Sequence, residues 1–179
     1  PLLRAARGRV VNIGSMAGFF STAFQGPYCA SKHAIEAFTD SMRRELEPFG
    51  MHVLLIQPGS IESRLIDKAD DHARALLRTL TDQQRALYAE AAERSLYAAG
   101  VAREHAAKPH GIIRAVTHAL ESKRPRPRYV VGTDAHIGKL LTKALPDRAM
   151  DWLLRKLDQA LKKKLSAEAA NRPATQSAS

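Results

Sequence analysis

Three short apolar runs stand between long segments of helical periodicity along this chain. The runs cover residues 10–13, 51–57 and 129–131. The middle run is nearly continuous in its apolar residues, which is typical of a parallel strand covered on both faces. The pattern therefore predicts an α/β fold built on a parallel sheet.

Apolar residues recur at helical spacing between these runs. The pattern predicts a long helix over residues 28–49, with Phe38 in its apolar stripe, and a shorter helix over residues 109–120. Charged residues of the long helix, including Glu36 and Asp40, are expected on its far side. The short run at 129–131 follows the second helix and reads as a short strand.

Residues 64–108 show helical patterning and no strand. Thr81 and Gln84 form a capping signal before the second of the helices expected here. The apolar content of the segment fits the lining of a roomy apolar pocket and equally the packing stripe that any amphipathic helix needs. The pattern leaves both interpretations open.

A basic amphipathic helix is expected over residues 147–165. Leucines at helical spacing form its apolar stripe, and lysines and arginines form the opposite face. Such a helix could lie on an anionic membrane surface, but docking of the stripe on the protein, with the charges in water, is the favoured interpretation. Residues 166–179, rich in Ala, Ser and Thr, are expected to form a disordered tail.

Composition supports a globular chain. Its 179 residues are 45% hydrophobic, which is enough for one domain with a substantial core. No apolar run approaches the ~18 residues of a membrane-spanning helix and no secretory leader is recognised, so a cytoplasmic location is expected, with peripheral membrane contact as a variant. The single cysteine, Cys29, excludes an internal disulfide and fits a small buried filler better than a reactive thiol.

Much of the net charge of +10 lies in residues 123–128 and 147–165. Without interleaved aromatic residues or a nucleic-acid motif, this charge does not indicate nucleic-acid binding. The Pro-rich basic run at 123–128 is interpreted as a solvated loop before a sheet-edge strand rather than as a phosphate site.

Residues 15–32 carry a candidate proton-transfer site. Ser15 follows the first apolar run, Tyr28 opens the long helix, and Lys32 comes one helical turn later. Residues four apart share a helix face, so the Lys32 ammonium can favour the phenolate of Tyr28 by roughly 2–3 kcal/mol at ~6 Å and an effective dielectric of ~20. Ser15 can reach the same point from the carboxyl edge of the sheet and hold a substrate oxygen.

The spacing of Ser15, Tyr28 and Lys32 resembles that of the catalytic serine, tyrosine and lysine of the short-chain dehydrogenase/reductase family. The resemblance implies a doubly wound, Rossmann-like parallel sheet with helices on both faces. It also implies an NAD(P)-dependent oxidoreductase that interconverts an alcohol and a carbonyl. In that role Ser15 would orient the substrate oxygen, Tyr28 would carry the proton, and Lys32 would also hold the cofactor ribose.

A second motif of the same family follows the middle run. The resemblance implies that the loop beginning at Pro58 and Gly59 touches the nicotinamide end of the cofactor. Ile61 would offer its backbone amide to the carboxamide, and Ser63 stands where the family usually has threonine. The resemblance implies NAD or NADP as the cofactor. In the family, side chains after the second strand select between the two, and this sequence does not include that region. No metal centre is predicted.

The family's glycine-rich cofactor turn and its catalytic asparagine have no counterpart in this sequence. The chain is therefore expected to be the C-terminal part of such an enzyme, with the N-terminal βαβ units missing. Residues 1–146 would belong to the Rossmann-like catalytic domain, with residues 64–108 as its helical substrate lid. The alternative is a catalytically inactive fragment that at most docks to partners or oligomerises.

The resemblance extends to substrate and partners. Residues 128–135 resemble the last-strand region of the hydroxysteroid and retinol dehydrogenase branch, which implies a lipophilic alcohol or carbonyl substrate. In the family, the helix at 28–49 forms much of the subunit interface, so a homo-oligomer is expected. Peripheral membrane contact would fall to residues 147–165.

Overall fold

The computed structural model describes residues 1–170, without the side chains of residues 64–67 and 168–170. The chain divides into two compact units. The sheet unit comprises residues 1–63 and 105–144, and the helical unit comprises residues 64–104 together with the segment that follows residue 144. Each unit is described by itself.

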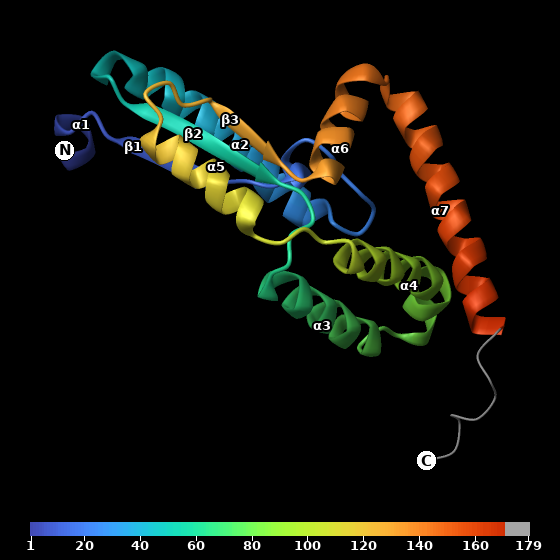
Figure 1. The fold of residues 1–179 in the computed structure, drawn as a ribbon. Coiled ribbons are helices and arrows are strands. Elements are labelled where there is room, and N and C mark those ends of the chain that lie inside the picture. Colours follow the sequence, from blue (N-terminus) through green and yellow to red (C-terminus); the bar gives the residue numbers. More distant parts are fainter. Residues whose placement is uncertain (171–179) are drawn as a thin grey trace. The chain divides into compact units, whose positions relative to one another are not determined.

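The sheet unit contains three parallel strands in the order β1-β2-β3, with Val10 opposite Val53 and Ile56 opposite Tyr129. Helices α2 and α5 cover opposite faces of the sheet (Figure 1). This confirms the predicted Rossmann-like arrangement of a parallel sheet between helices. The elements in chain order are α1 (Leu2–Ala5), β1 (Arg9–Ile13), the 3-10 turn η1 (Met16–Gly18), α2 (Gly26–Leu46), the 3-10 turn η2 (Glu47–Phe49), β2 (His52–Pro58), α5 (His110–Glu121), β3 (Arg128–Val131) and α6 (Thr133–Ala144).

The central strand β2 is buried on both faces, which explains its continuous apolar run. Leu54 and Ile56 pack against Ala119 of α5 and Tyr129 of β3. The alternate residues of β2 point to the other face, toward α2. At about 1.5–3 kcal/mol for each fully buried Leu or Ile, these side chains contribute much of the stability of the sheet unit.

Helix α2 buries a different face from the one expected. Phe38, placed in the apolar stripe, is 62% exposed, whereas Thr39 is buried. Glu36 and Asp40, expected on the far side, are partly buried and face the sheet. That assignment was wrong because polar side chains of β2 and β3 donate hydrogen bonds to these carboxylates, as described below.

The helical unit contains α3 (Arg64–Arg78), α4 (Asp82–Glu104) and α7 (Asp147–Ala170). Helix α4 packs against both α3 and α7. The expected capping signal is confirmed, since Thr81 and Gln84 exchange hydrogen bonds between side chain and backbone at 3.0 and 3.3 Å. Within the described residues, none of the helices combines the length and apolar content needed to cross a membrane.

Helix α7 docks on α4, the arrangement favoured from the sequence. Arg94 of α4 pairs with Asp158 at 3.2 Å, and Lys162 pairs with Glu90 at 2.6 Å. The helix runs to Ala170 rather than ending at residue 165, so a disordered tail from residue 166 was wrong for residues 166–170. Alanine and glutamate there are strong helix formers. The rest of the expected tail, residues 171–179, lies outside the described residues.

Candidate functional site

Ser15 lies directly beyond the carboxyl end of β1. The Gly14 amide donates to the Ile56 carbonyl at 2.8 Å, which continues the sheet pairing up to the residue before the serine. Ser15 then caps η1, and its Oγ accepts a hydrogen bond from the Ala17 amide at 3.2 Å. The hydroxyl is thereby held at the sheet edge where open α/β folds bind their ligands.

Tyr28 and Lys32 lie in the first turns of α2, as their spacing predicted. The Lys32 ammonium is 5.8 Å from the centroid of the Tyr28 ring, and the tyrosine is 39% exposed. The same ammonium donates to the Ile13 carbonyl at 3.4 Å. Lys32 therefore links the helix that carries Tyr28 to the strand end that precedes Ser15. Within the described part of the chain, Ser15 and Tyr28 share no hydrogen bond.

The start of α2 is set by Gly26 and Pro27, and proline in a first helical turn costs no backbone hydrogen bond. Cys29 next to Tyr28 is buried, as expected for a small filler. His33 contacts the Cys29 carbonyl through Nδ1 at 2.9 Å, on α2 itself. The buried Cys29 and the His33 contact both help to fix the helix turn that carries Tyr28.

The loop after β2 is held from two sides. On one side, the Ala107 amide donates to the Ser60 carbonyl at 2.9 Å and the Glu62 amide donates to the Ala107 carbonyl at 3.1 Å. This is a parallel bridge between Ile61 and Ala107, so the N–H and C=O of Ile61 point away from Ala107. On the other side, the Ser60 amide donates to Asp134 at 2.6 Å. Ser63 is exposed.

Helix α2 and the turn after Ser15 approach each other closely at Gly18. A methyl group at Gly18 would lie 2.9 Å from the Lys32 carbonyl and 2.9 Å from Cγ of Glu36. The turn at residues 15–18 is called the serine turn below. The absence of a side chain at Gly18 lets this turn pack against the helix turn that follows Lys32.

A buried polar network lies under α2. The Gln57 side-chain amide, 1% exposed, donates to Glu36 at 2.5 Å and accepts from Lys139 of α6 at 2.7 Å. Arg128 of β3 donates to Glu36 at 3.2 Å and to Asp40 at 2.6 Å. The network joins α2, β2, β3 and α6 immediately before the loop that begins at Pro58.

This network perturbs the acids and bases in it. Burial raises the pKa of Asp40, but the hydrogen bond and charge of Arg128 outweigh this and hold that pKa below its usual value. Burial lowers the pKa of Arg128, yet its bonds to Asp40 and Glu36 raise it overall. Burial lowers the pKa of Lys139, and Glu36 offsets only part of that effect. The charged forms of the Asp40 and Arg128 pair are thus stabilised.

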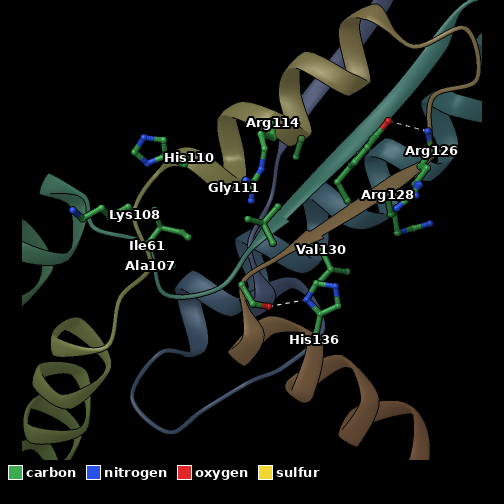
Figure 2. Close-up of a pocket in the computed structure, with 14 residues that line it drawn as sticks. Ile61, Ala107, Lys108, His110, Gly111, Arg114, Arg126, Arg128, Val130 and His136 are labelled. Carbon is green, nitrogen blue, oxygen red and sulfur yellow. Dashed lines mark hydrogen bonds between the residues drawn. The ribbon is translucent and has the colours of Figure 1, made fainter.

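A separate cavity of about 620 Å³ runs along the outer side of β3 (Figure 2). Ser15, Tyr28 and Lys32 do not line it, and Ile61 is its only residue shared with the sites predicted from the sequence. The cavity is therefore distinct from the Tyr28 region. Among the residues described, its lining contains no carboxylate and includes the basic or imidazole side chains of Lys108, His110, Arg114, Arg126, Arg128 and His136.

The chain is similar in sequence to known proteins of one family. The sequence model described as short chain dehydrogenase matches residues 1–74. The chain is 38% identical over 160 residues to retinol dehydrogenase 7 of Rattus norvegicus. This match covers 86% of this chain and 50% of that protein. The chain is 37% identical over 162 residues to retinol dehydrogenase 16 of Mus musculus, with the same two coverages. The chain thus spans about half the length of the curated relatives it matches.

The fold has a solved counterpart at low sequence identity. A short chain dehydrogenase from Burkholderia cenocepacia, solved in complex with NADP, superposes with a TM-score of 0.58 at 19% identity. The match covers 86% of this chain and 50% of that chain. The likeness at this identity concerns the fold.

Proposed function

This chain belongs to the short-chain dehydrogenase/reductase family, and we propose that it supplies the proton-transfer residues of an oxidoreductase interconverting an alcohol and a carbonyl. One observation carries the proposal. The Lys32 ammonium contacts both the Tyr28 ring and the carbonyl at the end of β1, two residues before Ser15. A cation, a phenol and a hydroxyl thus gather around one sheet edge, which is the set that proton exchange with an alcohol requires.

In this proposal each of the three side chains has a separate role. Ser15 donates its hydroxyl hydrogen to the substrate oxygen and orients it, since the Ser15 Oγ already accepts from Ala17. Tyr28, partly exposed, transfers the proton between its phenol oxygen and the substrate oxygen. The Lys32 ammonium stabilises negative charge on the Tyr28 oxygen and binds the cofactor ribose. The chemistry that a bound nicotinamide would supply is hydride exchange with the substrate carbon, accepted by the oxidised form from an alcohol or donated by the reduced form to a carbonyl.

The loop at 58–63 fits the nicotinamide end of NAD or NADP. The bridge to Ala107 directs the Ile61 N–H away from Ala107, which supports the proposal that this amide donates to the cofactor carboxamide. Pro58 and Gly59 set the turn, and the exposed Ser63 offers a hydroxyl. Both cofactors enter the test below.

The substrate we propose is a small lipophilic alcohol or carbonyl compound. Both relatives reported above bear the name retinol dehydrogenase, and the sequence at 128–135 resembles that branch of the family. The location that goes with this proposal is cytoplasmic or membrane-peripheral. Assay with retinol and with a short alcohol of similar reactivity measures the preference, and a higher kcat/KM for the short alcohol would count against it.

Self-association through α2 is part of the proposal. Phe38 is 62% exposed on the outer side of this helix, where a second copy could cover it. Light scattering of the natural full-length protein should show an oligomer that Phe38→Asp weakens. A monomer at all concentrations would remove this element of the proposal.

The central test compares Tyr28→Phe with the parent protein in its natural length. Alcohol oxidation with NAD⁺ and with NADP⁺ should fall by about 10²–10⁴ in Tyr28→Phe, because a positioned acid or base contributes that much. Ser41→Ala, which removes an exposed hydroxyl from the same helix several turns beyond Lys32, is the control and should keep full activity. Retained turnover in Tyr28→Phe would exclude this tyrosine as the proton carrier.

The competing hypothesis is an inactive chain that serves at most in docking or oligomerisation. Calorimetric titration of the 179-residue chain with NADH and NADPH separates the two. Micromolar binding by this chain alone would argue strongly against the inactive reading.

A further inference from the structure

The loop after β2 and the start of α6 are tied together by one carboxylate. Asp134 lies in the first turn of α6, and its Oδ2 accepts the Ser60 amide at 2.6 Å, across 74 residues of chain. Its Oδ1 accepts the adjacent Ala135 amide at 2.8 Å. Both oxygens are therefore engaged by backbone N–H groups, a strong form of charge-assisted hydrogen bonding.

Gly59 is required by this carboxylate rather than by its backbone conformation. Among the described glycines, positive φ angles occur at Gly50 and Gly132, and Gly59 is not one of them. A methyl group built on Gly59 would overlap the Asp134 carboxylate. The methyl group of an alanine at residue 59 would therefore meet the Asp134 carboxylate first, and the carboxylate would have to move.

Gly132 completes the arrangement from β3. Its φ of +104° disfavours other residues, and a methyl group there would lie 2.6 Å from Oδ1 of Asp134. The Gly59 amide donates to the Val131 carbonyl at 2.8 Å. The glycines that follow β2 and β3 thus flank the same carboxylate, which lies between the ends of the two strands.

Two contacts restrain the backbone around Ile61. Asp134 holds Ser60 on one side of the loop and Ala107 brackets Ile61 on the other. If Asp134 acted only as a cap for α6, it would need neither the Ser60 amide nor a glycine at residue 59. The contact between the Asp134 carboxylate and the Ser60 amide therefore holds the loop at 58–63 in addition to capping α6.

We propose that Asp134 is a positioning residue that fixes the loop at 58–63 so that the Ile61 amide meets the nicotinamide end of the cofactor. This inference rests on the proposed function for the identity of the ligand. It assigns to Asp134 a role that needs no contact with the cofactor or the substrate.

The test uses four variants of the natural full-length protein: Asp134→Ala, Asp134→Asn, Gly59→Ala and the double variant Gly59→Ala with Asp134→Ala. Gly100→Ala in α4 is the matched control, because nothing lies within 4 Å of the methyl group it adds. Each variant is measured by amide hydrogen exchange at Ser60, by thermal unfolding and by the Kd for NADH and NADPH. Exchange at Val53 in the buried core monitors global opening.

Asp134→Ala should accelerate Ser60 exchange at least about tenfold, leave Val53 exchange unchanged, and raise the dinucleotide Kd about tenfold, the loss expected for one hydrogen bond to a charged group. Asp134→Asn keeps an acceptor oxygen and should recover part of the affinity. Gly59→Ala should weaken binding in the parent but add little in the Asp134→Ala background, because the obstructing carboxylate is gone.

Three outcomes would overturn the inference: unchanged Ser60 exchange in Asp134→Ala, an unchanged Kd despite faster exchange, or a Gly59→Ala effect that simply adds to that of Asp134→Ala. Failure of the proposed function looks different. A parent protein that binds neither dinucleotide, yet shows Ser60 protection dependent on Asp134, would remove the cofactor role and leave the loop attachment established.

Discussion

The side-chain amide of Gln57 donates to the Glu36 carboxylate at 2.5 Å, at the next-to-last residue of the largely apolar strand β2. The same amide accepts from the Lys139 ammonium at 2.7 Å, so one buried side chain links helices α2 and α6 to the central strand β2. Gln57 immediately precedes Pro58, where the loop that is proposed to meet the cofactor begins. A polar residue is kept here because it joins the two charges that flank it.

Gln57→Leu should lower the free energy of unfolding by about 1–3 kcal/mol, because Glu36 and Lys139 each lose a buried hydrogen-bond partner while the volume changes little. Urea denaturation of the parent and the variant measures the difference. Ser41→Ala is the control. It removes an exposed hydrogen bond between Ser41 and Glu45 of α2, the helix that carries Glu36, and should change the free energy of unfolding by less than about 0.5 kcal/mol. Equal stability of Gln57→Leu and the parent would show that the network contributes nothing.

Gly18→Ala tests the close approach between the serine turn and α2. The added methyl group would lie 2.9 Å from the Lys32 carbonyl, a backbone atom that cannot rotate away, so the turn must shift. Overpacking of this kind costs about 1–3 kcal/mol and should displace Ser15 from the Tyr28 side of the sheet edge, lowering kcat/KM for the alcohol.

Gly26→Ala is the matched control for this experiment, because nothing lies within 4 Å of the methyl group it adds in the same loop region. It should leave activity intact, since alanine is also the better helix former at the start of α2. If both variants kept full activity and stability, close packing at Gly18 would have no part in placing Ser15.

The sequence was sufficient for the elements whose pattern is decided locally. The continuous run at 51–57 is a buried parallel strand within one residue of its expected bounds, and the Thr81 cap begins α4 as predicted. The spacing of Tyr28 and Lys32 placed both side chains together because helical geometry fixes it. The roles assigned to these two residues and to Ser15 stay predictions.

Features that depend on distant partners could not be read from the pattern. Glu36 and Asp40 looked solvent-facing because a helical wheel does not show that β2 carries Gln57 and β3 carries Arg128. Helix α6 was not anticipated, since it follows β3 after a single glycine and its apolar residues are few. The hydrogen bond from Ser60 to Asp134 joins the loop at 58–63 to the segment at 128–135. Each segment can be recognised in the sequence, but their contact is seen only in the folded structure.

Asp40→Asn should make stability less dependent on pH. The pKa of Asp40 lies below its ordinary value in the folded state, so its charged form stabilises the fold at pH values above the unfolded pKa, and this contribution is lost as the pH falls through the lowered folded pKa. At pH 7 the variant should be less stable by about 1–2 kcal/mol, since the pair with Arg128 is partly buried.

Urea denaturation at pH 7, at pH 5 and near pH 3 measures this effect as a difference between variant and parent. The difference should be full at the two higher pH values and shrink at the lowest, because both proteins then carry a neutral side chain at residue 40. Asp71→Asn, at an exposed position of α3, serves as the control for the loss of one negative charge. A difference that stays constant over the whole range would exclude the Asp40 charge as its source.

The docked position of α7 predicts unequal effects for two leucines of its apolar stripe. Leu157 is 52% exposed, whereas Leu161, one turn later, is only partly exposed where α7 packs along α4. Leu161→Asp should lower the free energy of unfolding of the helical unit by about 2–4 kcal/mol through lost burial and a desolvated charge, and Leu157→Asp should change it by less than about 1 kcal/mol. Circular dichroism during urea denaturation measures both. A helix that instead bound an anionic membrane through this stripe would co-sediment with phosphatidylserine vesicles in a salt-sensitive manner, and both substitutions would reduce that binding alike.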